Sequence, residues 1–419
     1  MRTIHADLLT AQQAQNKDPY VKMTIDGTDY GTDSGKLISY EWREEPYRES
    51  AVIVLGNSDR AFDSINLLGK SFFIGEGYVS AGAVNRYCGD GAGSDSPPTL
   101  WVKSQIIISM EGKSICVLEC EGAWGKLREQ SFTGIAGSFA SLVVDEVLVI
   151  SGSTGTLAQI PVNGTSVAIT GKTITTDYTV TAATGVITEV GGNLPDGNYL
   201  VTYNYPVRAP YLGLTFISAD VIFDLVEDIL VAAGFTLNAI GTQDDGITTG
   251  FNPVFTANPE SFESPAYTIK KLMDMTKSYL RQVEGSAFEV VYPQSADAVQ
   301  ETYYSDQAPY FKEYAERKSL VVPNSIVVFA NKNADGSWTD PPMITSAAAT
   351  DADSIAAYGT VSKYYIEPYL DNQTDADNRA SALLTKIKSE ALAGRLVLNF
   401  MDCRVELFDK EQILDGRGI

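Results

Sequence analysis

Histidine and basic residues are scarce in this 419-residue sequence, and each shortage argues against a class of function. The only histidine is His5, so Ser-His-Asp, Cys-His and HExxH sites lack the base or ligand that they need. Lys and Arg total 31 against 53 Asp and Glu, which gives a formal net charge of −22. This balance argues against a protein that grips nucleic acid or docks on an anionic membrane, and it favours solubility.

Long apolar segments are also missing. No window holds about 18 consecutive apolar residues, so we expect no membrane-spanning segment. The first 20 residues, MRTIHADLLTAQQAQNKDPY, have no apolar core of the length that a signal peptide needs.

The four cysteines, Cys88, Cys116, Cys120 and Cys403, form no CxxC pair. Cys116 and Cys120 lie four residues apart in an expected strand, too far apart to bridge locally. We predict buried free thiols in a reducing compartment.

Motifs for phosphate binding and nucleophilic catalysis are absent as well. The sequence contains neither GxxxxGK[ST] nor GxSxG. Gly75-Glu76-Gly77 lacks the third glycine and the following helix of a dinucleotide fingerprint. His5 precedes a short amphipathic pattern at residues 6–15, where we expect a solvated side chain. We therefore predict no catalytic, cofactor-binding or metal-binding residue, and no enzyme.

What the sequence does contain points to strands and tight turns. Hydrophobic residues make up 44%, with 35 glycines and 22 tyrosines, and the length suggests two to four domains. Short apolar segments separated by Gly, Asn and Asp turns predict a barrel or sandwich in the first third. The expected strands are residues 21–25, 37–42, 50–55, 71–74, 100–108 and 114–119.

From about residue 131 the composition shifts to small residues, Thr, Val and Gly. Apolar and polar residues alternate on both sides of Ala183-Thr184-Gly185, which predicts a hairpin, and Pro195-Asp196-Gly197 supplies the next turn. With its own strands and few charges, this segment is expected to form a separate β-module.

Helical patterns follow residue 210. We expect helices at 218–235, capped by Ser218 or Asp220 and ended by Gly234, and at 264–283, with Pro265 in its first turn. A third is expected at 375–394, stopping at Gly394. Residues 288–293, 395–400 and 403–408 read as strands.

The stretch KSLVVPNSIVVFANK, residues 318–332, has apolar residues on both sides of Pro323-Asn324. β-Branched and aromatic residues predict strand, and proline cannot donate to a central ladder. We expect a bend at a sheet corner or edge.

Three groups of polar residues were weighed as sites. A glycosidase needs two carboxylates, and Glu44 with Glu45, or Glu284 with Glu289, could supply them, but solvated charges are the simpler interpretation. Asp244-Asp245-Gly246 and 351–353 could hold calcium, yet match surface turns better. The tyrosines Tyr303, Tyr304, Tyr310, Tyr314, Tyr364, Tyr365 and Tyr369 suit a core or a subunit interface better than a glycan platform.

Several stretches resemble the baseplate or tail-tip hub proteins of tailed bacteriophages. The similar features after residue 210 are VIFDLVEDILVAAGF, NPVFTANPES, YTIKKLMDMTKSYLRQ, YFKEYAERKSLVVPNSIVVFANK and DSIAAYGTVSKYYIEPYL. In the N-terminal third they are GKLISYEWREEPYRESAVIVLGNSD and LLGKSFFIGEGYV. The segment at 131–207 departs from the family's core, although DYTVTAATGVIT is similar to hairpins of other phage tail proteins.

The resemblance implies a mainly β fold with an α+β portion. It implies tube-like β-barrel domains at 1–130 and 301–419, an inserted β-module at 131–208 and a helical α+β element at 209–300. Hubs of this kind are homotrimers in which two barrels per subunit build a pseudo-six-fold ring. The ring joins a hexameric tail tube to a three-fold tip and lets DNA pass as non-specific cargo.

The partners so implied are the tail tube or distal tail protein, a spike, fibre or tip protein, and the tape measure protein. The location would be the virion tail, assembled in the host cytoplasm. Two alternatives stay open: a carbohydrate-binding receptor-recognition tail protein, and a cell-wall hydrolase with a carboxylate pair.

Overall fold

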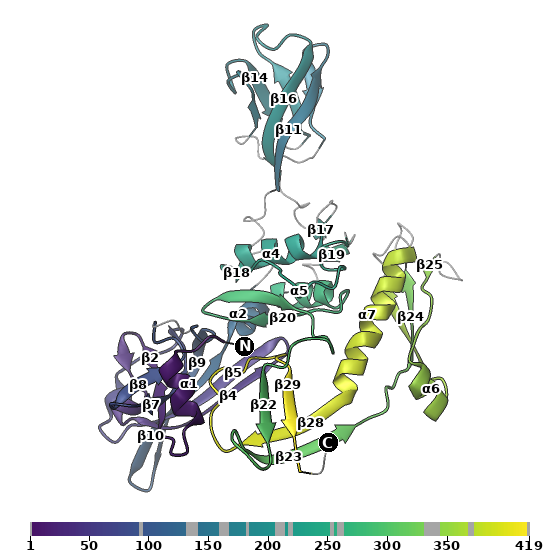
Figure 1. The fold of residues 1–419 in the computed structure, drawn as a ribbon. Helices are drawn as coiled ribbons and strands as arrows, with labels where there is room; N and C mark the ends of the chain where they lie inside the picture. Colours follow the sequence, from purple (N-terminus) through teal and green to yellow (C-terminus); the bar gives the residue numbers. More distant parts are fainter. Residues whose placement is uncertain are drawn as a thin grey trace.

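The computed structural model describes residues 2–91, 95–130, 141–158, 167–181, 184–205, 214–216, 221–251, 255–257, 264–330, 344–367 and 373–416. The fold is mainly β with an α+β portion, as predicted. A small β-module stands apart at the top of Figure 1, above a layer of helices, an N-terminal β region and a C-terminal region with one long helix. None of the described helices is both long and apolar enough to cross a membrane.

The N-terminal region pairs its strands into one large sheet and two small ones. Its helices are α1 (Ala6–Gln13) and α2 (Ala123–Glu129). Its strands are β1 (Pro19–Lys22), β2 (Thr24–Ile25), β3 (Thr28–Asp29), β4 (Leu37–Glu45), β5 (Arg48–Gly56), β6 (Ser71–Phe72), β7 (Gly75–Ser80), β8 (Val84–Tyr87), β9 (Leu100–Met110) and β10 (Lys113–Glu121). The sheets run β4-β5-β10-β9-β6, β1-β7-β8 and β2-β3. Among the described strands the large sheet is an open half-barrel, because β4 and β6 each pair on one side only.

Alternation of side chains along β5 and β10 builds the core of this region. In antiparallel register Leu55 lies opposite Cys116, Ile53 opposite Leu118 and Ala51 opposite Cys120, and all six are buried. The predicted buried free thiols are confirmed for Cys116 and Cys120 here, and for Cys88 and Cys403 elsewhere.

The β-module is built from two three-stranded sheets, β11-β16-β13 and β12-β15-β14. Its strands are β11 (Ser141–Ile150), β12 (Thr154–Thr156), β13 (Ala168–Ile169), β14 (Tyr178–Thr181), β15 (Val186–Glu189) and β16 (Gly197–Tyr205). The predicted hairpin is present, with Thr181 opposite Val186, although residues 182–183 of its turn lie outside the described residues. The module encloses its own core, made of Leu148, Ile150, Leu157, Val167, Ile169, Tyr178, Ile187, Leu194, Val201 and Tyr203.

The α+β element packs two helices against a small sheet. Its parts are β17 (Leu214–Phe216), α4 (Ile222–Ala232), β18 (Thr236–Leu237), β19 (Phe255–Ala257), α5 (Pro265–Met273), β20 (Tyr279–Gln282) and β21 (Ala287–Val291). Gly234 ends α4 as predicted: it has a φ of +87°, and Phe235 N–H donates to the Leu230 carbonyl at 2.8 Å. The caps predicted at Ser218 and Asp220 lie outside the described residues.

The prediction of a helix through residue 283 is wrong. α5 ends at Met273, and Tyr279–Gln282 is a strand. The Met273 carbonyl accepts hydrogen bonds from Thr276 Oγ1 at 2.8 Å and Lys386 Nζ at 2.7 Å. Because side chains satisfy this helix-end carbonyl, the chain can leave the helix and place Leu280 in the core through β20.

The C-terminal region divides its strands among small sheets. Its elements are β22 (Glu301–Tyr304), β23 (Phe311–Lys318), β24 (Ser325–Ala330), β25 (Ile344–Thr345), β26 (Ala349–Thr350), α6 (Ala352–Tyr358), β27 (Ser362–Glu367), α7 (Gln373–Ala391), β28 (Leu392–Leu398) and β29 (Glu411–Leu414). β22 pairs with β29, β23 with β28, and β24 with β25, β26 and β27.

The bend predicted at Pro323 lies between two strands, not within one. β23 ends at Lys318 and β24 begins at Ser325, so the apolar residues 320–322 are not strand. Asn324 is inaccessible and holds the bend, accepting from Val361 N–H at 2.8 Å and donating to the Gly359 carbonyl at 2.9 Å.

Two further predictions for this region are wrong. α7 ends at Ala391, and Gly394 lies in β28, where a Cβ would sit 3.1 Å from the Ala315 carbonyl oxygen. Residues 403–408 are a loop, because their backbone groups bond to individual groups outside a sheet ladder. Cys403 N–H donates to Gln12 Oε1, Glu406 N–H donates to Asp409 Oδ2, and the Leu407 carbonyl accepts from Arg281.

A single core joins the α+β element to parts on either side of it. It contains Trp124 of α2, Leu225 of α4 and Ile269 of α5, and also Ile326 of β24 and Ala380 of α7. Apolar packing is therefore continuous across residue 300. The domain boundary expected there stays a prediction.

The separate core of the β-module leads to a prediction. Replacing residues 133–206 with a short Gly-Ser linker should leave the rest folded, with a melting temperature within about 4 °C of the parent. Circular dichroism melting and size-exclusion chromatography would measure this. As a matched control, Tyr203→Ala should destabilise the module alone. Loss of folding in the deletion variant would place this segment in the common core.

Candidate functional site

Neighbouring groups contact most of the candidate catalytic residues. His5 stands at the start of α1, where its Nδ1 accepts from Asp7 N–H at 3.1 Å. Glu44 pairs with Arg2 at 3.0 Å, and Glu289 pairs with Arg281 at 2.5 Å. Glu284 is exposed and accepts weakly from Ser96 N–H at 3.4 Å. Glu45 is exposed and follows Glu44 directly on β4, and successive side chains of a strand point to opposite faces of the sheet.

The two candidate calcium segments act as turns and caps. Asp245 accepts from the N–H groups of Ile247 and Thr248 at 2.9 and 2.8 Å, and from Lys277 N–H at 2.6 Å. Asp351 caps α6 and pairs with Lys388 at 2.7 Å. Within the described residues no cluster of three His, Cys, Asp or Glu side chains could hold a metal ion.

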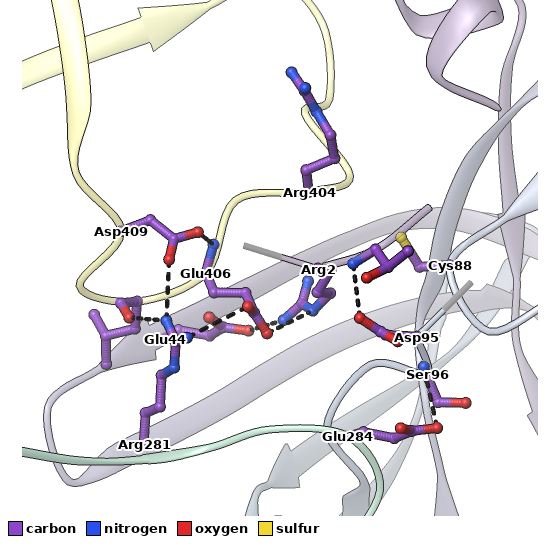
Figure 2. A network of polar contacts seen from close by, with 12 residues as sticks. Arg2, Glu44, Cys88, Asp95, Ser96, Arg281, Glu284, Arg404, Glu406 and Asp409 are labelled. Atoms are coloured by element: carbon purple, nitrogen blue, oxygen red, sulfur yellow. Dashed lines mark hydrogen bonds and ion pairs between the residues drawn. The ribbon is translucent and has the colours of Figure 1, made fainter. Parts of the chain in front are cut away.

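The most concentrated charge in the described structure is a network that joins the two ends of the chain (Figure 2). Arg2 contacts Glu44 of β4 at 3.0 Å and Glu406 of the 401–410 loop at 3.4 Å. Arg281 of β20 contacts Glu406 at 3.5 Å and Asp409 at 3.2 Å. We call these residues the charged joint.

Backbone groups of the 401–410 loop complete the charged joint. Arg2 N–H donates to the Arg404 carbonyl at 2.9 Å, and Arg281 Nη1 donates to the Leu407 carbonyl at 2.7 Å. The charged joint thus holds four segments together: the N-terminus, the half-barrel sheet, the α+β sheet and the C-terminal loop.

Burial determines the electrostatics here. Burial alone would lower the pKa of the Arg2 guanidinium, but Glu44 and Glu406 outweigh it and hold that pKa above its ordinary value. Burial raises the pKa of Glu44, although Arg2 opposes the shift. Burial also raises the pKa of Glu49 and of Glu76, which lie on the neighbouring strands β5 and β7. The geometry supports a structural role, since each arginine already contacts carboxylates of other segments.

Sequence reasoning missed this network because its members are far apart in the chain. Arg2 and Glu406 are separated by about 400 residues, and no local pattern marks a charge whose partner is so distant. Glu44 was interpreted as one of two solvated charges in sequence, and its burial depends on Arg2.

Half-buried and exposed apolar side chains lie in rows on the outer face of the half-barrel. Val54, Val117 and Ile106 lie side by side on β5, β10 and β9, with Ile115 and Ile108 in the next row. Val52 is 42% exposed and Ile106 is 39% exposed. The signal was present in the sequence: Ile106-Ile107-Ile108 puts apolar side chains on both faces of a strand.

A second bare face lies on β24 and β27. These strands are parallel, with Val327 beside Tyr364 and Phe329 beside Ile366. Ile326 and Val328 enter the shared core with α7, while Tyr364 and Ile366 are 61% and 62% exposed. Parallel strands are usually covered on both faces. An exposed apolar face on parallel strands is therefore typical of a surface that binds another protein.

The described tyrosines of this group differ in their surroundings. Tyr303 is buried and donates to Asp402 at 2.9 Å, and Tyr365 packs against the shared core. Tyr310 and Tyr364 are exposed, and Tyr304 and Tyr314 are half-buried. Tyr369 lies outside the described residues.

Comparison with known proteins shows a likeness of fold alone. No family model matches the sequence. No curated protein matches it either. Among solved structures, the fold is similar to that of the tail protein from Neisseria meningitidis MC58, with a TM-score of 0.54 and 10% identity, over 96% of this chain and 88% of that chain. A 43 kDa tail protein of prophage MuSo2 from Shewanella oneidensis reaches a TM-score of 0.47 at 10% identity, over 94% and 86%, which is too low to establish a shared fold.

Glu411, beside the charged joint, gives a pH-dependent prediction. Burial, with Asp409 and Asp402 nearby, raises the pKa of Glu411 to about 7, and both carboxylate oxygens are buried without a hydrogen-bond partner. In the unfolded chain the pKa of a glutamate is near 4.3. Because the pKa of Glu411 is higher in the folded chain, its contribution to folding stability is greatest below the unfolded pKa. That stability is lost as pH rises through 7.

Glu411→Gln should therefore raise the free energy of unfolding at pH 8 by about 1–2 kcal/mol and change it little at pH 5. Urea unfolding at both pH values measures this. Glu313→Gln, at an exposed ion pair with Arg395, is the control and should show no such difference. Equal effects of Glu411→Gln at both pH values would contradict the assignment.

Proposed function

We propose that this chain is a non-enzymatic structural subunit of a bacteriophage tail. The observation that carries the proposal is the fold similarity to a tail protein along 96% of the chain. The two bare apolar faces support it, because exposed faces of this kind mark surfaces that bind other proteins.

More specifically, the chain is a baseplate or tail-tip hub that forms a homotrimer. The regions predicted at 1–130 and 301–419 alternate around a pseudo-six-fold ring, which joins the hexameric tail tube to a three-fold tip. Its neighbours are the tube or distal tail protein, a spike, fibre or tip protein, and the tape measure protein. It functions in the virion tail, after assembly in the host cytoplasm.

Open sheet edges support a ring. Among the described strands, β4 and β6 each lack a neighbour on one side, and β23 and β28 pair only with each other. Free edges recruit further strands, so they need cover. In a closed ring each subunit contacts the next one head to tail. Every subunit then has the same sheet edges covered by a neighbour, and no subunit is left with an uncovered edge.

A charge on the outer face of the half-barrel tests the interface. Ile106→Lys should weaken trimer association at least about 100-fold. Ile106 lies in one row with Val117 and Val54, so the new ammonium group would be buried between subunits without a carboxylate partner. Sedimentation velocity over a range of concentrations measures the association. Val147→Lys is the matched control: Val147 is 59% exposed on the module, and the variant should assemble normally. Unchanged assembly of Ile106→Lys with an intact fold would remove this face from the interface.

The acidic excess gives a second test of the ring. DNA carries one charge about every 1.7 Å along its axis, and basic walls would retain it by releasing counterions. Asp and Glu should outnumber Lys and Arg on the inner wall by a larger ratio than on the outer wall. A reconstruction of the assembled ring, with charged side chains counted by radius, measures both ratios. A neutral or basic inner wall would contradict the DNA passage and leave solubility as the role of the excess.

The carbohydrate-binding alternative rests on the exposed Tyr310, Tyr358 and Tyr364. It requires retention of the protein on host surface polysaccharide, with loss of retention when these rings are replaced by alanine. A hub without this activity elutes unretarded. Release of polysaccharide fragments would instead support a hydrolase.

A further inference from the structure

Cys88 and Cys403 lie in contact although 315 residues separate them. Cys88 follows β8, and its thiol lies 2.9 Å from the Cys403 carbonyl oxygen, to which it donates. Both residues are inaccessible and belong to a small core with Leu8 and Tyr78. The charged joint described above lies beside this core, where Figure 2 shows the Cys88 sulfur close to Arg2.

The backbone around each cysteine is held in place. Cys88 N–H donates to the Glu76 carbonyl at 3.0 Å within the β7–β8 pairing. Cys403 N–H donates to Gln12 Oε1 of α1 at 3.0 Å, and the preceding Met401 is hydrogen-bonded through both its N–H and its carbonyl to the Tyr78 hydroxyl. The contact between the two cysteines is therefore a fixed feature of the fold.

The other two cysteines provide an internal comparison. Cys116 and Cys120 are equally buried, but both lie on β10, four positions apart along one strand. A strand rises about 3.4 Å per residue, so their Cα atoms are roughly 13 Å apart, beyond the reach of a disulfide.

The reduced form is stable in the folded chain. A hydrogen bond with the Cys88 thiol, together with burial, raises the pKa of the Cys403 thiol far above its ordinary value. Since the thiolate is the nucleophile in disulfide exchange, the folded pair reacts slowly in a reducing compartment. Reaction requires the 401–410 loop to open locally, or takes place while the chain folds.

We propose that Cys88 and Cys403 form a latent disulfide site that closes when the protein meets a low-molecular-weight disulfide such as oxidised glutathione. One cysteine thiolate attacks the oxidant and expels one thiolate, which leaves a mixed disulfide. The second cysteine thiolate then attacks the protein sulfur and expels the other. In total, two protein thiols and one oxidant disulfide give one protein disulfide and two small thiols.

Closure would have a clear structural effect. The bridge would tie the end of β8 to the C-terminal loop, at the place where the charged joint already holds the same parts without a covalent bond. The site would stay open in a reducing cytoplasm and close once the protein reaches an oxidising medium. It would then prevent the C-terminal loop from separating from the half-barrel.

The test uses the full chain, unfolded and refolded in glutathione buffers of increasing oxidised-to-reduced ratio. Remaining thiols are trapped with an alkylating reagent, and peptides are mapped by mass spectrometry without reduction. We expect a peptide pair linking Cys88 to Cys403, 2 Da lighter than the two reduced peptides together. It should form at ratios that leave Cys116 and Cys120 alkylated. The oxidised protein should melt several degrees higher than the reduced protein.

Matched variants separate this bridge from other oxidation. Cys88→Ala and Cys403→Ala should each abolish the linked peptide and the gain in melting temperature, whereas Cys116→Ala should retain both. The peptide map of the parent chain shows directly whether Cys88 and Cys403 are linked. It therefore tests the proposal even if a substitution impairs folding. The proposal is overturned if Cys88 and Cys403 carry only single glutathione adducts, or link to Cys116 or Cys120.

Discussion

The ion pairs that Arg2 and Arg281 make with Glu406 constrain the arrangement of the whole chain. Both guanidinium groups are almost fully buried and reach the same carboxylate from distant parts of the sequence, Arg2 near the N-terminus and Arg281 in β20. Removing one partner would leave a buried charge uncompensated, at a cost of roughly 3–5 kcal/mol. The N-terminus, the half-barrel and the C-terminal loop therefore have to be in place together.

The remaining architecture builds outward from this constraint. The turn between β4 and β5 inserts Tyr47 into the shared core, where its ring meets Trp124 edge to face at 5.1 Å. Gln282 accepts from Ala123 N–H at 2.7 Å and donates to the Thr99 carbonyl at 3.0 Å, which links α2 and β9 to the α+β sheet. With these parts fixed, apolar side chains on β5–β10–β9 and on β24–β27 remain exposed among the described residues.

Sequence patterns correctly predicted the elements whose structure depends on residues near one another in the chain. Alternation identified β5 and β10, a glycine stop identified the end of α4, and a turn signal identified the β14–β15 hairpin. The same reasoning failed at residues 274–283 and 403–408, where single side chains distant in the sequence bond to the backbone. Lys386 donates to the Met273 carbonyl at the end of α5, and Arg281 donates to the Leu407 carbonyl. It also could not find the charged joint, since the burial of Glu44 depends on Arg2 folding against it.

The measurement that tests the central claim most directly is single-particle imaging of the unmodified full-length chain, with its mass in solution determined in parallel. The account predicts a closed particle of three copies, with two sheet-rich regions from each copy alternating around six similar positions and the β-modules projecting from the ring. A stable monomer at micromolar concentration, or a particle with two-fold symmetry, would contradict it.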